Sequence, residues 1–207
     1  MPTAPMRLAI AGVLVAVTAG VTPAQPPRSA PSAAAVAQNR RPRGVQVMGL
    51  TGPWPDGGVI PFRYSQAGEE LSPALSWSGV PEGVASFTLI VHDLDAATGD
   101  GTDDVLHWMV WNIPGSATGL PEGLAQGATL PDGSRQISVS GPYYRGPGAP
   151  ASGPPHHYAF ELYALDAPLA VPDTGPSPAA TRAAVVAAMV GHIHGKAVFL
   201  GRFKRGL

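Results

Sequence analysis

SFTLIVHD at Ser86–Asp93 and VLHWMVWNI at Val105–Ile113 are the two stretches of this 207-residue sequence that decide its fold. Both are rich in β-branched and aromatic residues and end at polar residues or Pro-Gly, as β-strands do. Similar runs recur at Tyr158–Leu165 and Lys196–Phe203. Shorter candidate strands lie at Val45–Met48, Val59–Phe62, Leu75–Trp77 and Gln136–Val139. The pattern predicts a mainly β protein.

The composition supports this fold class. The chain has 26 glycines and 24 prolines, about twice the average share, which excludes a helical bundle. Its 44% hydrophobic content argues against general disorder. The absence of cysteine excludes disulfides, thiolate metal sites and a cysteine nucleophile. A formal net charge of −1 gives no overall attraction to nucleic acid or acidic membranes, so no nucleic-acid partner is expected.

One helix is predicted near the C-terminus. Pro178 can open it, Thr181–His194 is rich in alanine and valine, and Gly195 can end it. His192 and His194 are two residues apart and would point to different sides of this helix. They lack the four-residue spacing of a metal-binding histidine pair.

The N-terminus has the layout of a signal peptide, residues 1–24. Arg7 precedes an apolar run over Leu8–Val21, and small residues precede a cleavage site after Ala24. The apolar run is shorter than the roughly 20 residues that a membrane span needs. An uncleaved anchor is the alternative, and a lipoprotein anchor is excluded because no cysteine follows. The prediction is an exported protein, periplasmic or extracellular.

Residues 25–43 form a predicted disordered linker, rich in alanine and proline, before a domain at 44–207. The linker holds four arginines, Arg28, Arg40, Arg41 and Arg43. Without these and Arg7, 8 basic residues face 14 acidic ones in 44–207, a formal charge of −6. The linker is either a solvated tether or an arm that touches an anionic surface. Any membrane contact would therefore be peripheral.

Polar residues cluster where three predicted strands begin or end. Asp93 and Asp95 follow the first strand, His107 lies at the start of the second, and His156 and Tyr158 lie at the start of the third. If the first two strands are antiparallel neighbours, and the third starts from the same rim, these side chains converge there. Aromatic residues would wall the site: Trp108, Tyr143, Tyr144 and Tyr158.

The two-residue period of a strand predicts which side chains share a face. His107, Met109 and Trp111 should share one face, and Trp77 and Trp111 are expected in the core. His92 should face away from Asp93, so it is left outside the predicted site.

The chemistry of this rim suits a small oxyanion, because imidazoles donate N–H groups and an adjacent carboxylate orients the ring. A metal site, an acid–base pair or no site at all are the alternatives. Asp93, Asp95 and Asp104 also stand at positions 1, 3 and 12 of a calcium loop. Thr98 replaces the required glycine and no glutamate ends the loop. We therefore predict neither a metal nor a cofactor.

The combined motifs resemble those of the phosphatidylethanolamine-binding protein family, also called Raf kinase inhibitor-like proteins, in its bacterial form. The resemblance spans about residues 45–205, and its order and spacing are specific. The motifs are Pro73–Trp77, Ser86–Ala96, His107–Pro114, Gly146-Pro147, Pro154–Tyr158, Phe160–Asp166, Gly191–Ile193 and Leu200–Phe203. The resemblance implies an antiparallel β-sandwich-like fold with a few short peripheral helices, one of them near the C-terminus.

The resemblance also implies a pocket for phosphate, phosphoethanolamine head groups or similar anions. The matched positions are Asp93, Asp95, His107, His156 and Tyr158. In this reading His107 and His156 donate to the anion, Asp93 orients a histidine and Tyr158 closes the wall. Leu94 and Ala97 replace two motif prolines, and Gly148-Ala149 interrupts the second motif. Proline fixes φ, so these departures predict a looser rim.

The sequence therefore predicts an exported, non-enzymatic binding protein with a small anion pocket. One alternative is an inhibitor of a protease or of another protein partner, such as a kinase. A second alternative is a hydrolase that uses Asp93 and His107, although the sequence has no nucleophile motif.

Overall fold

The computed structural model describes residues 44–97, 103–171 and 177–207. The predicted signal peptide and linker, residues 1–43, lie outside these ranges, and so does Thr98 of the rejected calcium loop. Within these ranges, no helix is long and apolar enough to span a membrane.

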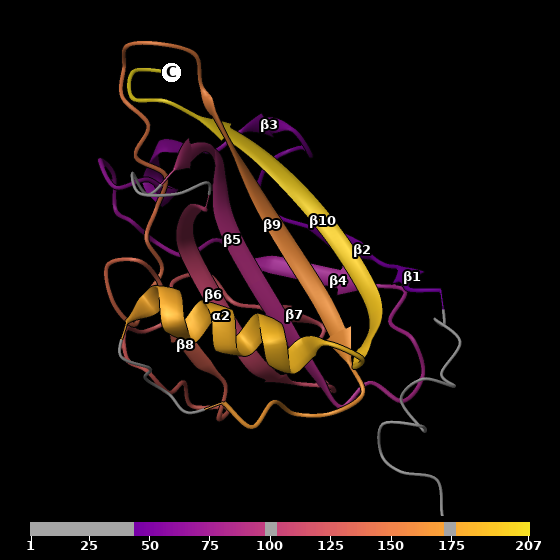
Figure 1. Ribbon diagram of the computed structural model, residues 1–207. Coiled ribbons are helices and arrows are strands. Elements are labelled where there is room, and N and C mark those ends of the chain that lie inside the picture. The colour runs from indigo at the N-terminus through magenta and orange to yellow at the C-terminus, as the bar shows by residue number, and fades with distance from the viewer. Residues whose placement is uncertain (1–43, 98–102, 172–176) are drawn as a thin grey trace, which may run out of the picture. The chain divides into compact units, whose positions relative to one another are not determined.

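A large sheet forms the centre of the fold (Figure 1), with strand order β1-β10-β9-β5-β6-β8 and β3 also paired with β10. The strands from β9 to β8 pair antiparallel with their neighbours, as does β10 with β9. β1 and β3 instead pair parallel with β10, so the sheet is mixed, whereas the expectation was an antiparallel one. The strands are β1 (Gln46–Val47), β3 (Gly58–Val59), β5 (Ser86–Ala97), β6 (Asp104–Pro114), β8 (Arg135–Ile137), β9 (His156–Leu165) and β10 (Ile193–Phe203). The mainly β prediction is confirmed.

A small sheet covers one face of the large one. It consists of β2 (Gly49–Thr51), β4 (Leu75–Ser78) and β7 (Gly119–Leu120). Leu50, Trp77 and Leu120 from this sheet are buried in one cluster with Phe87 and Phe160 of the large sheet. The two sheets therefore enclose the main core, and the prediction that Trp77 lies in the core is confirmed.

The one α-helix among the described residues, α2 (Pro178–Met189), packs on the opposite face of the large sheet (Figure 1). Val185 and Met189 join Met109 and Trp111 in a second buried cluster. Ser177 caps the helix, because its hydroxyl accepts a hydrogen bond from the Ala180 N–H at 3.1 Å. The protein thus has two sheets and a covering helix, with the large sheet in the middle.

The predicted end of this helix was wrong. α2 ends at Met189 instead of His194, because Gly191 adopts a left-handed conformation (φ +84°) that breaks the helix. β10 then begins at Ile193, three residues before the predicted strand. His192 and His194 lie beyond the helix, and both contact Asp166, at 2.6 and 3.0 Å.

The short strand predicted at Val59–Phe62 also differs. β3 ends at Val59, and Phe62–Tyr64 forms a 3-10 turn, η1, after Pro61. Pro61 lacks the N–H that would continue the strand pairing. This turn begins the segment that later forms one wall of the site.

A β-bulge in β6 sets the direction of His107. Val91 pairs with Trp108, whereas the next residue, His92, pairs with Leu106, so His107 is an extra residue in the ladder. Its ring packs against Tyr158 on the face of the small sheet, while Met109 and Trp111 lie on the helix side. The prediction that these three residues share a face was therefore wrong.

Candidate functional site

The predicted rim exists where β5 ends and β6 and β9 begin. Asp93 of β5 lies opposite Val105 of β6 on one side and Tyr158 of β9 on the other. A cavity of about 280 Å³ opens here. Four of the five predicted site residues line it: Asp93, His107, His156 and Tyr158.

The Asp93 carboxylate is the centre of the site. It is buried, with 3% of the residue exposed. Its Oδ2 accepts a hydrogen bond from His156 Nδ1 at 2.9 Å, and its Oδ1 accepts one from the Asp95 main-chain N–H at 2.9 Å. Tyr158 is the partner of Asp93 in the β5–β9 ladder. Asp93 therefore fixes the orientation of the His156 ring, as a buried carboxylate with several donors can.

The hydrogen bonds of His107 determine its tautomer. Nδ1 lies 2.9 Å from the Arg145 carbonyl oxygen and 3.1 Å from that of Gly146. Carbonyl oxygens only accept, so Nδ1 carries the proton. In the neutral ring Nε2, 4.0 Å from Asp93 Oδ2, then has a lone pair. Burial lowers the pKa of His107 below its usual value, which favours this neutral form.

Tyr158 contributes a neutral hydroxyl. Burial, together with the nearby Asp93 charge, raises the pKa of Tyr158 far above its usual range. The hydroxyl also accepts a hydrogen bond from the Gly148 N–H at 3.4 Å. Tyr158 thereby joins the sheet to the loop that closes the cavity.

Asp95 does not line the cavity. Its Oδ2 accepts hydrogen bonds from the His157 N–H at 2.6 Å and from His157 Nδ1 at 2.8 Å. Both hydrogen bonds lower the pKa of Asp95, and the one from the His157 main chain has the larger effect. The side chain is 43% exposed. Asp95 therefore acts on the site through its main-chain N–H alone.

The predicted aromatic wall was mostly wrong, because only Tyr158 of the four lines the cavity. The Trp108 and Tyr144 rings are buried and pack edge to face, with their centroids 5.4 Å apart. Tyr144 donates to the Tyr64 carbonyl oxygen at 3.1 Å, and Trp108 Nε1 donates to Gln136 at 2.9 Å. The remaining lining residues come instead from the strand ends and from two loops: Gln66, Ala96, Val105, Val139, Ser140, Arg145, Gly148, Ala149 and Pro150.

Sequence reasoning missed Gln66 and Arg145. Arg145 Nη2 donates to Gln66 Oε1 at 2.9 Å, and Gln66 Nε2 donates to the Gly146 carbonyl oxygen at 2.8 Å. Gly146 lies so close to Tyr64 that an added Cβ would be 2.4 Å from the Tyr64 carbonyl oxygen. No local pattern in the sequence signals a contact between residues 79 positions apart.

The three aspartates of the rejected calcium loop have separate partners. Asp93 binds His156, Asp95 binds His157, and Asp104 contacts His92 and Arg182. Among the residues that the structure describes, no group of three or more histidine, aspartate or glutamate side chains is arranged to hold a metal ion. His92 faces away from Asp93, as predicted.

Three comparisons with known proteins, by family model, by sequence and by structure, find the same family. A sequence model of the family described as "Phosphatidylethanolamine-binding protein" matches residues 51–204. The chain is 44% identical over 153 residues to a UPF0098 protein of Methanothermobacter thermautotrophicus, which covers 73% of this chain and 94% of that protein. It is 33% identical over 150 residues to the UPF0098 protein PH1269 of Pyrococcus horikoshii, covering 70% and 71% of the two chains.

Two solved structures are similar in fold. A phosphatidylethanolamine-binding protein homologue of Chlamydia trachomatis has a TM-score of 0.64 at 31% identity, covering 77% of this chain and 99% of its own. Escherichia coli YbcL has a TM-score of 0.64 at 28% identity, covering 76% and 98%. The matched region includes every residue that lines the cavity.

Proposed function

The chain belongs to the phosphatidylethanolamine-binding protein family, and we propose that it binds small phosphate-bearing anions in the Asp93 cavity without transforming them. The observation that carries this proposal is the pair of imidazoles, His107 and His156, held beside the cavity by fixed Nδ1 hydrogen bonds. Each ring then has Nε2 left for a ligand. A protonated ring donates from Nε2 to an oxyanion, which is a strong, charge-assisted hydrogen bond.

The arrangement favours binding over hydrolysis. Apart from Tyr158, Ser140 has the one hydroxyl among the described lining residues. In the described part of the chain, no hydrogen bond joins the Ser140 side chain to either imidazole. The Ser140 main-chain N–H donates to the Ser138 hydroxyl at 3.2 Å. A serine nucleophile needs an adjacent base, so this geometry argues against a serine hydrolase. Export to the periplasm or beyond, and a protease or kinase-like partner, stay predictions.

Calorimetric titration with inorganic phosphate and with phosphoethanolamine tests the proposal. The wild-type protein should give saturable binding, and a His107→Ala/His156→Ala double variant should lose at least about tenfold in affinity, since two charge-assisted hydrogen bonds are removed. A His192→Ala/His194→Ala variant is the matched control, because these histidines contact Asp166 and do not line the cavity. Equal binding by all three proteins, or turnover of a phosphoester, would refute a binding-only site at this rim.

A further inference from the structure

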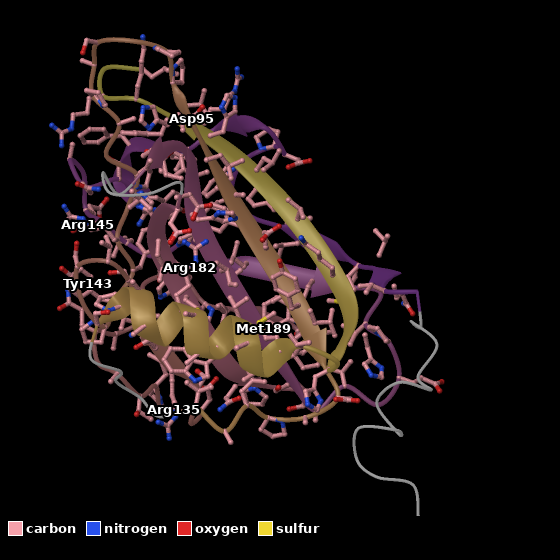
Figure 2. All side chains as sticks on the ribbon, viewed as in Figure 1. Asp95, Arg135, Tyr143, Arg145, Arg182 and Met189 are labelled. Atoms are coloured by element: carbon pink, nitrogen blue, oxygen red, sulfur yellow. The ribbon has the colours of Figure 1, made fainter. Side chains whose placement is uncertain are left out.

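Arg145 (Figure 2) lines the cavity, and hydrogen bonds to His107 hold its main chain in place. Its N–H donates to the His107 carbonyl oxygen at 2.9 Å, and its own carbonyl oxygen accepts from His107 Nδ1 at 2.9 Å. The two residues therefore hold each other in place. The guanidinium starts from a rigid position beside the anion-binding imidazole, and its side chain is 34% exposed.

The present partners of the Arg145 guanidinium hold it weakly. Its Nη1 lies 3.7 Å from Glu70 Oε1, a long ion pair in which both side chains are about one-third exposed. Its Nη2 bonds the neutral Gln66 amide oxygen. A partly exposed ion pair contributes little to stability, because water solvates both partners. A ligand oxygen can replace Glu70 at little cost.

Charge balance gives Arg145 a specific role. Among the lining residues that the structure describes, apart from the histidines and Tyr158, two have ionisable side chains. Asp93 has a carboxylate, and Arg145 has a guanidinium that is always protonated. The Asp93 carboxylate already accepts hydrogen bonds from His156 and from the Asp95 N–H. Beyond what the imidazoles balance, a second negative charge on a ligand can be balanced by the Arg145 guanidinium. Arginine suits this role because its planar fork binds two phosphate oxygens at once.

Glu70 supports the same interpretation. It is one of two non-glycine residues in the described chain with a left-handed backbone, at φ 54°. Such a conformation costs energy and is concentrated at functional sites. Here it directs the carboxylate to the Gly146 N–H, 3.3 Å away, and to Arg145. Glu70 thus helps to keep the guanidinium beside the cavity.

Resting on the proposed anion-binding function, we propose that Arg145 is a specificity-determining residue that selects phosphate monoester dianions over phosphate diesters. A monoester presents two negative charges and three free oxygens, enough for the imidazoles and for the guanidinium fork. A diester, such as the head group of an intact phospholipid, presents one charge and two free oxygens. The preferred ligand class is therefore a small, water-soluble phosphate monoester.

A matched pair of ligands tests this selection. Phosphoethanolamine is a monoester and glycerophosphoethanolamine is the corresponding diester, and both carry the same ammonium group. At about pH 7 most of the monoester is already a dianion, because its second pKa is about 6, and the loss of affinity expected at higher pH is still small. We expect wild type to bind the monoester about tenfold more tightly than the diester, and Arg145→Gln to remove that preference by weakening the monoester alone.

Two further variants separate charge from structure. Arg63→Gln removes a cation from the neighbouring segment that pairs with Glu69 and Glu122 and does not line the cavity, so it should keep the preference. Arg145→Lys keeps the charge but loses the fork, so it should keep part of the preference, and melting temperatures show whether each variant is folded. Equal binding of both ligands by wild type, or an equal loss for both in Arg145→Gln, would overturn the selection but leave the anion site standing. Failure of wild type to bind either ligand would overturn the proposed function itself.

Discussion

At the scale of single residues, the tautomer of His107 decides how this site treats an anion. The two carbonyl oxygens at Nδ1 force the N–H to that side, so the neutral ring offers Nε2 only as an acceptor. Because burial lowers the pKa of His107, the neutral form of the ring is favoured. An anion at Nε2 favours the protonated ring and raises this pKa again. Anion binding should therefore be accompanied by proton uptake.

This coupling predicts a pH dependence for sulfate, which does not itself titrate near neutrality. Affinity should be constant below the pKa of His107 in the free protein, which lies under its ordinary 6.5, and should fall as pH rises above it. The largest slope is about tenfold per pH unit for one proton. Calorimetry between about pH 5 and 8 measures the slope. His107→Ala should lower it, and His157→Ala, outside the cavity, should keep it; a flat wild-type profile would contradict proton uptake.

At the scale of elements, the cavity depends on two loops that pack together beside the sheet. Gly146 lies against Tyr64 of η1, and the Gln66 side chain bonds the Gly146 carbonyl oxygen. A side chain at position 146 would meet backbone atoms, which cannot move as the end of a flexible side chain can. The loop before β9 therefore keeps its distance from η1 only while residue 146 is glycine.

Gly146→Ala should open this loop contact. The added methyl group would overpack the interface and lower the free energy of unfolding by about 1–3 kcal/mol, as measured by urea denaturation. Phosphate affinity should fall as well, because the carbonyl oxygens that hold His107 belong to Arg145 and Gly146. Gly44→Ala, where an added Cβ meets nothing within 4 Å, is the control. Unchanged stability and affinity in Gly146→Ala would show that the loops are not rigidly coupled.

The sequence predicted the elements better than their details. The strand runs and their polar ends placed Asp93, His107, His156 and Tyr158 at one rim, because antiparallel neighbours bring one strand's end beside the next strand's start. The bulge at His107 breaks the two-residue period, so alternation alone cannot show it. Gln66 and Arg145 were missed because their contact depends on the packing of two distant loops.

At the scale of the whole molecule, a chain of charges joins the helix to the sheet on the face away from the cavity. Arg182 of α2 (Figure 2) bonds Asp104 at 2.5 Å, and Asp104 contacts His92. His92 Nε2 lies 3.5 Å from Glu161, which accepts from Lys196 at 2.6 Å. The chain thus connects α2, β6, β5, β9 and β10. The His92 imidazole close by, followed by the Lys196 ammonium, lowers the pKa of Glu161 to about 2 despite partial burial.

This lowered pKa predicts acid sensitivity. Glu161 contributes stability that is fully present above its unfolded pKa of about 4.5 and is lost as pH falls toward the folded value of about 2. The contribution at neutral pH is about 2–3 kcal/mol. Urea unfolding at successive pH values should show this loss, and Glu161→Gln should remove much of it. Glu82→Gln, on an exposed residue, should leave the acid dependence as it is; the same acid dependence in Glu161→Gln would exclude Glu161 as its source.

We propose that the rim formed by β5, β6 and β9 binds phosphate-bearing anions through His107 and His156. The most direct measurement is a titration with inorganic phosphate while the ring signals of the six histidines are followed by NMR. We expect His107 and His156 to shift together along one saturation curve, and His192 and His194, which contact Asp166, not to shift. A saturating shift centred on other histidines, or no saturating shift at all, would contradict this proposal.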